Sequence, residues 1–133
     1  LVSDFREYQE TSIPSDRFGR DALYNDSYSL PSVLQEEVAH LHLVEPGQWP
    51  GHCSQYNRTS DIHLAYCRGY YNTKHYLLML ILKPNAHELA RDNNKMHKLA
   101  KMAAKFREDH RTHQHIRKLL RWALDKNRIL GMQ

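Results

Sequence analysis

Two adjoining stretches decide the fold: IHLAYCRGYY (Ile62–Tyr71) and KHYLLMLILK (Lys74–Lys83). Each is predicted to be a β-strand, and Asn72-Thr73 between them is a predicted hairpin turn. The second stretch is apolar on both faces, which is typical of a central strand, and Pro84 ends it. Val38–Glu45 is a further predicted strand. The sequence therefore predicts a three-stranded antiparallel meander.

Helical patterns flank this meander. Residues 2–12 are predicted to be the end of a helix that stops at Pro14, and residues 14–32 form a long irregular stretch rich in turn residues. A loop of that length in a compact domain is more often functional or partner-binding than idle. From Ala86 the apolar period changes from two to 3.6. One helical face then carries Leu89, Met96, Leu99, Ala103 and Phe106.

The sequence after Pro84 is compatible with two helical arrangements. A single register places His87, Arg91, Asn94 and the lysines of the segment opposite its apolar face, whereas Asp92-Asn93-Asn94 would instead cap a fresh helix and break that register. The tail over 111–133 has its own helical pattern, with Thr112 as N-cap and Gly131 as stop. The fold class is α+β: a small antiparallel sheet packed with helices on one face, with an added C-terminal helix.

Composition limits the class of protein. The 133 residues suit one domain, 1–133, and no apolar run approaches the ~18 residues that span a bilayer, so we expect no membrane partner. Two cysteines and no signal peptide at the start predict a reducing, cytoplasmic setting, and a chain that begins with Leu1 is expected to start inside a longer protein.

Charge is unevenly distributed along the chain. Residues 1–82 carry a net charge of −4 and residues 83–133 a net charge of +8, which together give the overall +4. A basic block of this kind is typical of a protein that binds nucleic acid, and equally of a solvated helical surface.

Motifs for metal or nucleophilic chemistry are weak. His40 and His42 share one face of a predicted strand, and His63 shares a face with Cys67, while Cys53 lies on another segment. Without a CxxC pair or HExxH, this spacing is unspecific, and hydrogen-bonded histidines are the better interpretation. The chain also lacks G-x-S-x-G and a P-loop. We therefore predict neither a metal nor another cofactor.

RNA cleavage has more support. Metal-free scission needs a base for the 2′-hydroxyl proton, an acid for the leaving 5′-oxygen and cations for the phosphorane-like charge. The segment 83–98 is dense in suitable groups, and polar residues of the strand region can face the same groove. The first set is Lys83, His87, Arg91, His97 and Lys98, and the second is Arg58, Asp61, His63 and Tyr66.

Several stretches, read together, also carry a family resemblance. They are FGRDALY (Phe18–Tyr24), VAHLHL (Val38–Leu43), HLAYC (His63–Cys67), Leu82-Lys83-Pro84 with HELARDNNKMHK (His87–Lys98), and Arg58-Thr59. Over residues 3–108 the chain resembles the YafO family of bacterial toxins. The resemblance implies a type II toxin that cleaves translated mRNA on the ribosome, a cognate antitoxin, a bacterial cytoplasmic location and, by analogy, a RelE-like fold.

The chain departs from that family at both ends. Family members carry a longer N-terminal region, which is expected to add a strand. The family-like core spans 1–109, and the helical extension 110–133 is expected either to dock on the ribosome or to complete the core. The oligomeric state stays open.

Chemistry suggests roles for the candidate residues. His87 or His97 is the expected general base or acid, and Asp61 would orient a cation or a histidine. His63 is a further catalytic candidate, with a buried hydrogen-bonded role as the alternative. Arg20 and Asp21 are expected to form a structural ion pair. Phosphate charge would be stabilised by Lys83, Arg58 and Arg91, and RNA would be contacted by Lys98, Lys101, Lys105 and Arg68.

Two other functions remain as alternatives. One is a non-catalytic nucleic-acid-binding regulator that uses residues 86–130 as paired helices, although the junction at 109–112 lacks the Gly turn of a helix-turn-helix. The other is a toxin of the same fold with a different target, such as gyrase.

Overall fold

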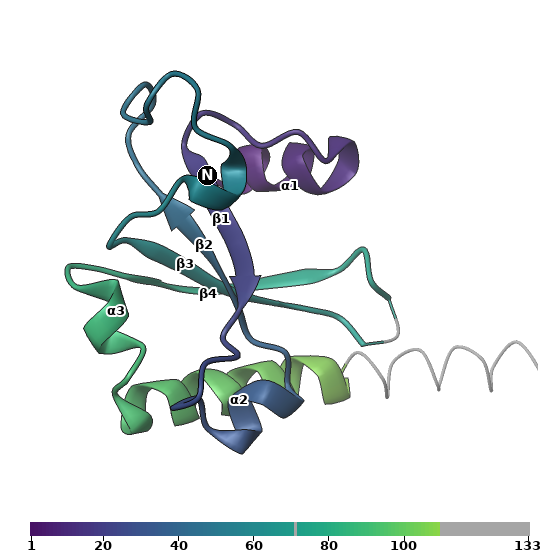
Figure 1. Cartoon of the computed structure of the whole chain (residues 1–133). Helices are drawn as coiled ribbons and strands as arrows, with labels where there is room; N and C mark the ends of the chain where they lie inside the picture. The colour runs from purple at the N-terminus through teal and green to yellow at the C-terminus, as the bar shows by residue number, and fades with distance from the viewer. Residues whose placement is uncertain (71, 110–133) are drawn as a thin grey trace, which may run out of the picture.

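The computed structural model of the protein describes residues 1–70 and 72–109. Its four strands form one antiparallel sheet in the order β1-β2-β3-β4 (Figure 1). The strands are β1 (Phe18–Leu23), β2 (Ala39–Leu43), β3 (His63–Arg68) and β4 (Tyr76–Leu82). The helices are α1 (Val2–Thr11), α2 (Pro31–Gln35), the 3-10 turn η1 (Gln55–Asn57), α3 (Ala86–Leu89) and a helix from residue 93 to residue 109. The α+β class is confirmed.

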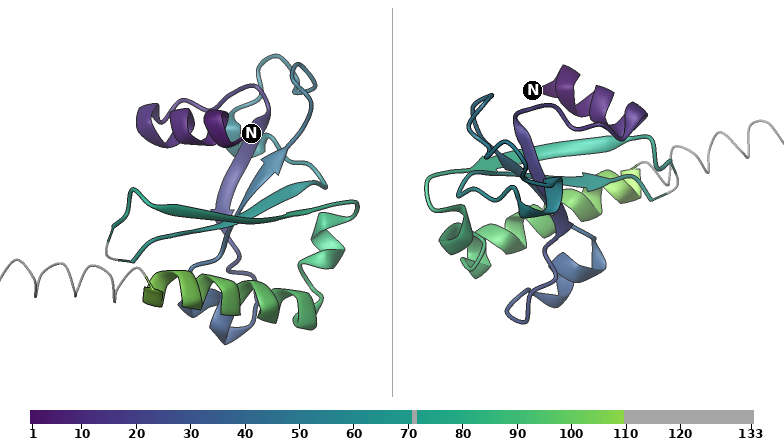
Figure 2. Two further views of the ribbon diagram at one scale, coloured as in Figure 1. Left: turned by 180° about the vertical axis from the view of Figure 1, so that it is seen from behind. Right: turned by 45° about the horizontal axis from the view of Figure 1, so that its top comes forward.

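Helices cover both faces of the sheet, so the prediction of one covered face is wrong (Figure 2). On the first face α1 inserts Phe5 into a cluster with Phe18, Leu41, Leu64 and Tyr66. On the second face the helix over 93–109 packs Met96, Leu99 and Ala103 onto side chains of the sheet and its connections, among them Val38, Ala65, Cys67 and Leu82. The sheet is thus the middle of three layers.

The strand β1 was not predicted, because it lies inside the stretch 14–32 that reads as a loop. Its sequence FGRDAL contains a glycine and two charged residues, which are poor strand formers. Tertiary contacts override that preference: Phe18 is completely buried, and the Asp21 carboxylate accepts hydrogen bonds from the hydroxyls of Tyr8 and Tyr66.

The strand β4 lies at an edge of the sheet in the described part of the chain, and not at its centre. Its apolar character on both faces comes from the helices above and below it, since Leu77 and Met79 pack toward one core cluster and Tyr76 and Leu78 toward the other. Two-sided burial therefore misidentified an edge strand as a central one.

The segment after Pro84 is broken, as the second reading of the sequence predicts. The short helix α3 ends at Leu89, and a new helix begins at residue 93. The Asp92 carboxylate caps it by accepting hydrogen bonds from the amides of Asn94 and Lys95, at 3.0 and 3.2 Å. The predicted helix over 111–133, with Thr112 and Gly131, lies outside the described residues.

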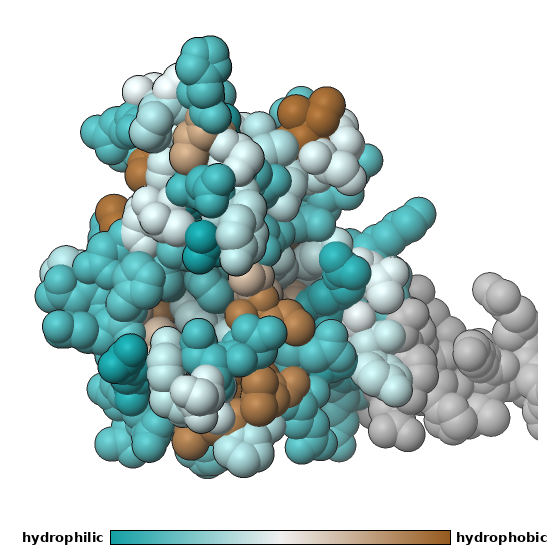
Figure 3. All heavy atoms as spheres, in the orientation of Figure 1, coloured by the Kyte–Doolittle hydropathy of each residue, from teal (hydrophilic) through white to brown (hydrophobic). Residues whose placement is uncertain are grey.

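The surface is largely polar in the orientation of Figure 1. Figure 3 shows apolar side chains gathered mainly over α2 and the helix beneath the sheet, where Leu34 is 46% exposed. In the described part of the chain, no helix combines the length and the apolar character that crossing a membrane requires.

The strand β1 passes tightly beneath the loop that follows η1. A Cβ atom added at Gly19 would lie 2.2 Å from the carbonyl oxygen of Arg58, whereas a Cβ at Gly51 would meet nothing within 4 Å. That same carbonyl accepts a hydrogen bond from the amide of Arg20 at 2.7 Å.

We expect Gly19→Ala to lower the free energy of unfolding by about 1–3 kcal/mol, because the backbone of the loop must shift. The matched substitution Gly51→Ala should change it by less than about 0.5 kcal/mol. Urea denaturation of both variants measures the difference. Equal stability of the two variants would show that this close approach is not rigid.

Candidate active site: a histidine cluster beside Asp61

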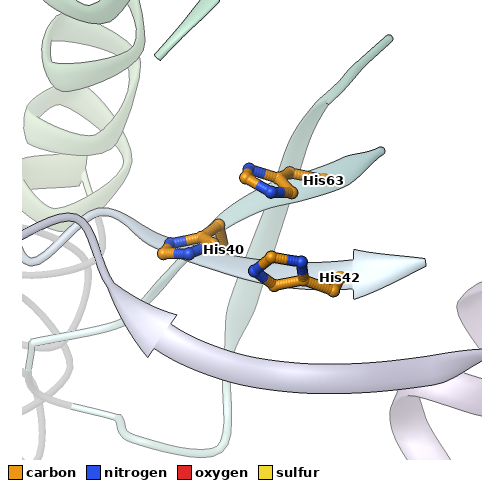
Figure 4. A group of neighbouring side chains, drawn as sticks. All are labelled: His40, His42 and His63. Carbon is orange, nitrogen blue, oxygen red and sulfur yellow. The ribbon is translucent and has the colours of Figure 1, made fainter. Parts of the chain in front are cut away.

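The pairing of β2 with β3 gathers three histidines on one face of the sheet. His42 lies directly opposite His63, and His40 lies two residues before His42 on the same face. The centroids of the His42 and His63 rings are 4.2 Å apart, and those of His40 and His63 are 4.7 Å apart. Figure 4 shows the three rings side by side. This is the face that the helix over 93–109 covers.

Each ring has a distinct environment. The Nδ1 atom of His42 lies 2.8 Å from the amide nitrogen and 2.9 Å from the carbonyl oxygen of Ser60. The Nδ1 atom of His63 lies 3.2 Å from the Tyr24 hydroxyl, and the Tyr24 ring stacks on His40 at 4.2 Å between centroids. Within residues 1–70 and 72–109, Nδ1 of His40 and Nε2 of His63 are buried and have no hydrogen-bond partner.

Burial keeps the three imidazoles neutral. It lowers the pKa of His40 and of His42 to about 4, and that of His63 to about 3. Repulsion between the rings lowers the pKa of His40 and of His63 further. At neutral pH each ring therefore carries one N–H and one nitrogen lone pair.

His87 and Asp61 form an exposed pair at the edge of this cluster. The His87 ring centroid lies 5.0 Å from that of His63 and 5.9 Å from that of His42. Its Nδ1 atom lies 2.9 Å from Oδ1 of Asp61, and both side chains are at least half exposed. The hydrogen bonds from His87 lower the pKa of Asp61, which keeps the carboxylate ionised. Asp61 thereby holds Nδ1–H of His87 and leaves Nε2 free to accept a proton.

Cationic side chains lie in two places, beside Asp61 and near the histidine cluster. A surface hollow of about 370 Å³ has Asp61, Lys83 and Arg17 in its lining. From β1, Arg20 lies close enough for its charge to lower the pKa of His40 and of His42. Its guanidinium stacks over the Tyr56 ring at 4.2 Å and donates a hydrogen bond to the Tyr56 carbonyl.

Arg17 and Arg20 are site residues that the sequence analysis missed. The predicted ion pair between Arg20 and Asp21 is wrong, because Asp21 accepts from Tyr8 and Tyr66 instead. No sequence pattern places Arg20 there: its position depends on the strand β1, in which Ala22 pairs with His40, and on an irregularity of β1 between Phe18 and Asp21.

The structure brings together some of the predicted residues and separates others. Asp61, His63 and His87 lie together as expected, and Lys83 lines the hollow beside Asp61. The guanidinium of Arg58 donates to the Cys53 carbonyl at 3.1 Å, and that of Arg91 stacks over the Tyr28 ring at 4.7 Å. The prediction that Tyr66 faces the same groove is wrong, because Tyr66 is buried on the other face of the sheet and its hydroxyl donates to Asp21. The remaining predicted residues are exposed, on β3 for Arg68 and on the helix over 93–109 for His97, Lys98, Lys101 and Lys105.

Comparison with known proteins gives the family. Residues 6–108 match the sequence model of the family described as "Toxin YafO, type II toxin-antitoxin system". The chain is also 49% identical over 109 residues to the mRNA interferase toxin YafO of Escherichia coli (strain K12), a match that covers 80% of this chain and 83% of the relative. No solved structure matches the chain, so the expected RelE-like fold stays a prediction. The chain belongs to the YafO family of type II toxin–antitoxin toxins.

Proposed function

We propose that this protein is an mRNA interferase, a toxin that cleaves mRNA on the ribosome, stops translation and is neutralised by a cognate antitoxin. The name of the Escherichia coli relative supports the cleavage of mRNA, and the type II family supports the antitoxin. Cleavage on the ribosome, without a metal ion, is the finer part of the proposal.

The observation that carries the proposal is the exposed His87–Asp61 pair. Asp61 fixes the tautomer of His87, so the free Nε2 lone pair is available to the 2′-hydroxyl of a bound nucleotide. The 2′-oxygen then attacks phosphorus, the bond from phosphorus to the 5′-oxygen breaks, and the 5′-oxygen takes up a proton. His63, His42 and His40 form the neutral wall behind His87.

Positive charge at the pair suits the phosphorane-like transition state. Lys83 and Arg17 line the hollow that Asp61 shares, and they would hold the nonbridging oxygens of the scissile phosphate. The Arg17 guanidinium also lies 3.8 Å from the Asp4 carboxylate and would exchange that exposed ion pair for the phosphate. Arg58 and Arg91, engaged with Cys53 and Tyr28, would contact the RNA backbone on either side of it. Substrate would therefore lie across the end of the sheet at Asp61.

A shortage of acid and base groups supports the proposed dependence on the ribosome. Among the described residues of the candidate site, His87 supplies the one exposed imidazole. The imidazoles of His40, His42 and His63 behind it are neutral. The ribosome would hold the mRNA strained and in line, and water or a ribosomal group would supply the proton for the 5′-oxygen. The exposed lysines of the helix over 93–109 would bind rRNA: Lys98, Lys101 and Lys105.

Primer extension on a translated message, with and without the toxin, tests the function itself. The toxin is treated with EDTA beforehand, and the ribosomes stay in their normal Mg²⁺ buffer. We expect new 5′ ends only when the message is being translated. Pulse labelling of protein and DNA synthesis runs alongside. Loss of DNA synthesis before protein synthesis would favour a gyrase poison, and binding without cutting would favour a regulator.

His87→Ala should reduce the cleavage rate by about 10²–10⁴-fold, because it removes the proton acceptor. Asp61→Asn should give a smaller loss, since the amide still holds the ring but no longer favours its charged form. His52→Ala, an exposed loop histidine, is the matched control and should cut normally. His97→Ala decides between the two histidines that the sequence singles out. A larger loss for His97→Ala than for His87→Ala would overturn the assignment.

The triple variant Lys98→Ala/Lys101→Ala/Lys105→Ala should bind ribosomes more weakly and with a shallower salt dependence. Each lost phosphate contact lowers the slope of log K against log salt by about 1. Lys74→Ala, which removes an exposed charge at the start of the β4 hairpin, is the control. Sedimentation with ribosomes at several salt concentrations measures both effects. An unchanged slope would remove the helix from the ribosome contact.

A further inference from the structure

We propose that His40, His42 and His63 form a binding site for one divalent transition-metal ion such as Zn²⁺. Each ring offers one ligand nitrogen, and these three atoms all lie within 4.8 Å of one another. Imidazole nitrogen is a preferred ligand of Zn²⁺, Co²⁺ and related ions. The inference goes beyond the proposed cleavage, which uses His87 and needs no metal.

Unsatisfied nitrogens are the first argument for this site. In the described part of the chain, Nε2 of His63 and Nδ1 of His40 are buried and have no hydrogen-bond partner. His63 as a whole is only 2% exposed. A buried polar atom left without a hydrogen bond costs about 1–3 kcal/mol. An ion between the rings would use both lone pairs at once.

The outer partners of the rings are the second argument. Metal-ligating histidines usually donate their other ring N–H to an oxygen, which fixes the tautomer. Nδ1 of His63 lies 3.2 Å from the Tyr24 hydroxyl, and Nδ1 of His42 lies 2.9 Å from the Ser60 carbonyl oxygen. For His63 this leaves Nε2 as the ligand. Nδ1 of His42 also lies 2.8 Å from the Ser60 amide nitrogen, and His42 offers Nε2 to the ion in the tautomer whose Nδ1–H donates to the Ser60 carbonyl oxygen. Burial keeps the imidazoles neutral, so few protons need to be displaced.

The geometry needs only a small adjustment. In a tetrahedral site with Zn–N bonds of about 2.0–2.1 Å, ligand nitrogens are ~3.4 Å apart, so the widest pair must close by on the order of 1 Å. Both strands are adjacent in the sheet, and ring rotation about the side-chain bonds covers that distance. The exposed His87–Asp61 pair lies beside His63, and an ion would enter the cluster from this side.

Charge around the site is mixed. Arg20 acts on His40 and His42 and opposes a cation, whereas the Asp61 carboxylate at the entrance favours one. The Arg20 guanidinium is already held by the Tyr56 ring and carbonyl, which draws it toward the loop after β2. Coordination of the ion by three imidazole nitrogens then outweighs the repulsion from Arg20.

The test titrates Zn²⁺ and Co²⁺ into the full chain, freed of antitoxin, purification tag and metal. We expect one ion per chain at the cluster, the visible absorption bands of tetrahedral Co²⁺, and a melting temperature that rises with Zn²⁺ concentration. His63→Ala and His42→Ala should each weaken binding by about 100-fold or more, and Tyr24→Phe, which removes an outer partner, by about 10- to 100-fold.

Two controls separate this site from other histidines. His52→Ala and the triple variant His110→Ala/His113→Ala/His115→Ala, whose residues lie outside the described part, should keep the single ion. Ring ¹⁵N chemical shifts of the unsubstituted chain give a readout that does not depend on variants folding: Nε2 of His63 and His42 should shift on adding Zn²⁺. No shift at these nitrogens, or binding lost only in the triple variant, would overturn the proposal. Cleavage with metal-free toxin is scored separately, so either proposal can fail alone.

Discussion

The register between β2 and β3 is the constraint on which the site depends. It places His42 opposite His63 and, through the two-residue alternation of a strand, His40 on the same face. A slip by one residue would turn His40 and His42 toward α1 and bring Leu41 into their place. The buried Leu41 and Leu64 on the other face oppose such a slip, because they would then leave the cluster formed with Phe5 and Phe18.

A short segment before β3 ties the parts of the site together. The Arg58 carbonyl accepts from the Arg20 amide, the backbone of Ser60 contacts the His42 ring, and Asp61 holds His87. The carbonyl of Asp61 also accepts from the amide of Ala86 at the start of α3. Residues 58–61 thus connect β1, β2 and the segment after Pro84. The candidate site residues from Arg17 to His87, seventy positions apart in the sequence, are therefore held together by this one backbone segment.

Sequence reasoning recovered the parts of the fold whose local pattern agrees with their structure. The strands β2, β3 and β4 alternate or run apolar as strands do, and Asp92 has the capping chemistry that breaks the helix before residue 93. The strand β1 was not predicted because its residues serve tertiary contacts and not strand propensity. Gly19 allows a close backbone approach, Arg20 places a cation near the histidines, and Asp21 accepts hydrogen bonds from two tyrosine hydroxyls. Of the candidate site residues predicted from the sequence, Asp61, His63 and His87 do lie together, because the turn before β3 meets the start of α3. Arg17 and Arg20 were lost together with the strand, and His40 and His42 were noted as a pair but not joined to His87.

The open edge of β4 has a practical consequence for work with the isolated toxin. In the described part of the chain, this strand has unpaired amides and carbonyls along one side, and Leu80 and Ile81 are 42% and 36% exposed. Edge strands of this kind template intermolecular pairing and aggregation. A binding partner that pairs with this strand would satisfy these backbone groups and remove the template in concentrated samples.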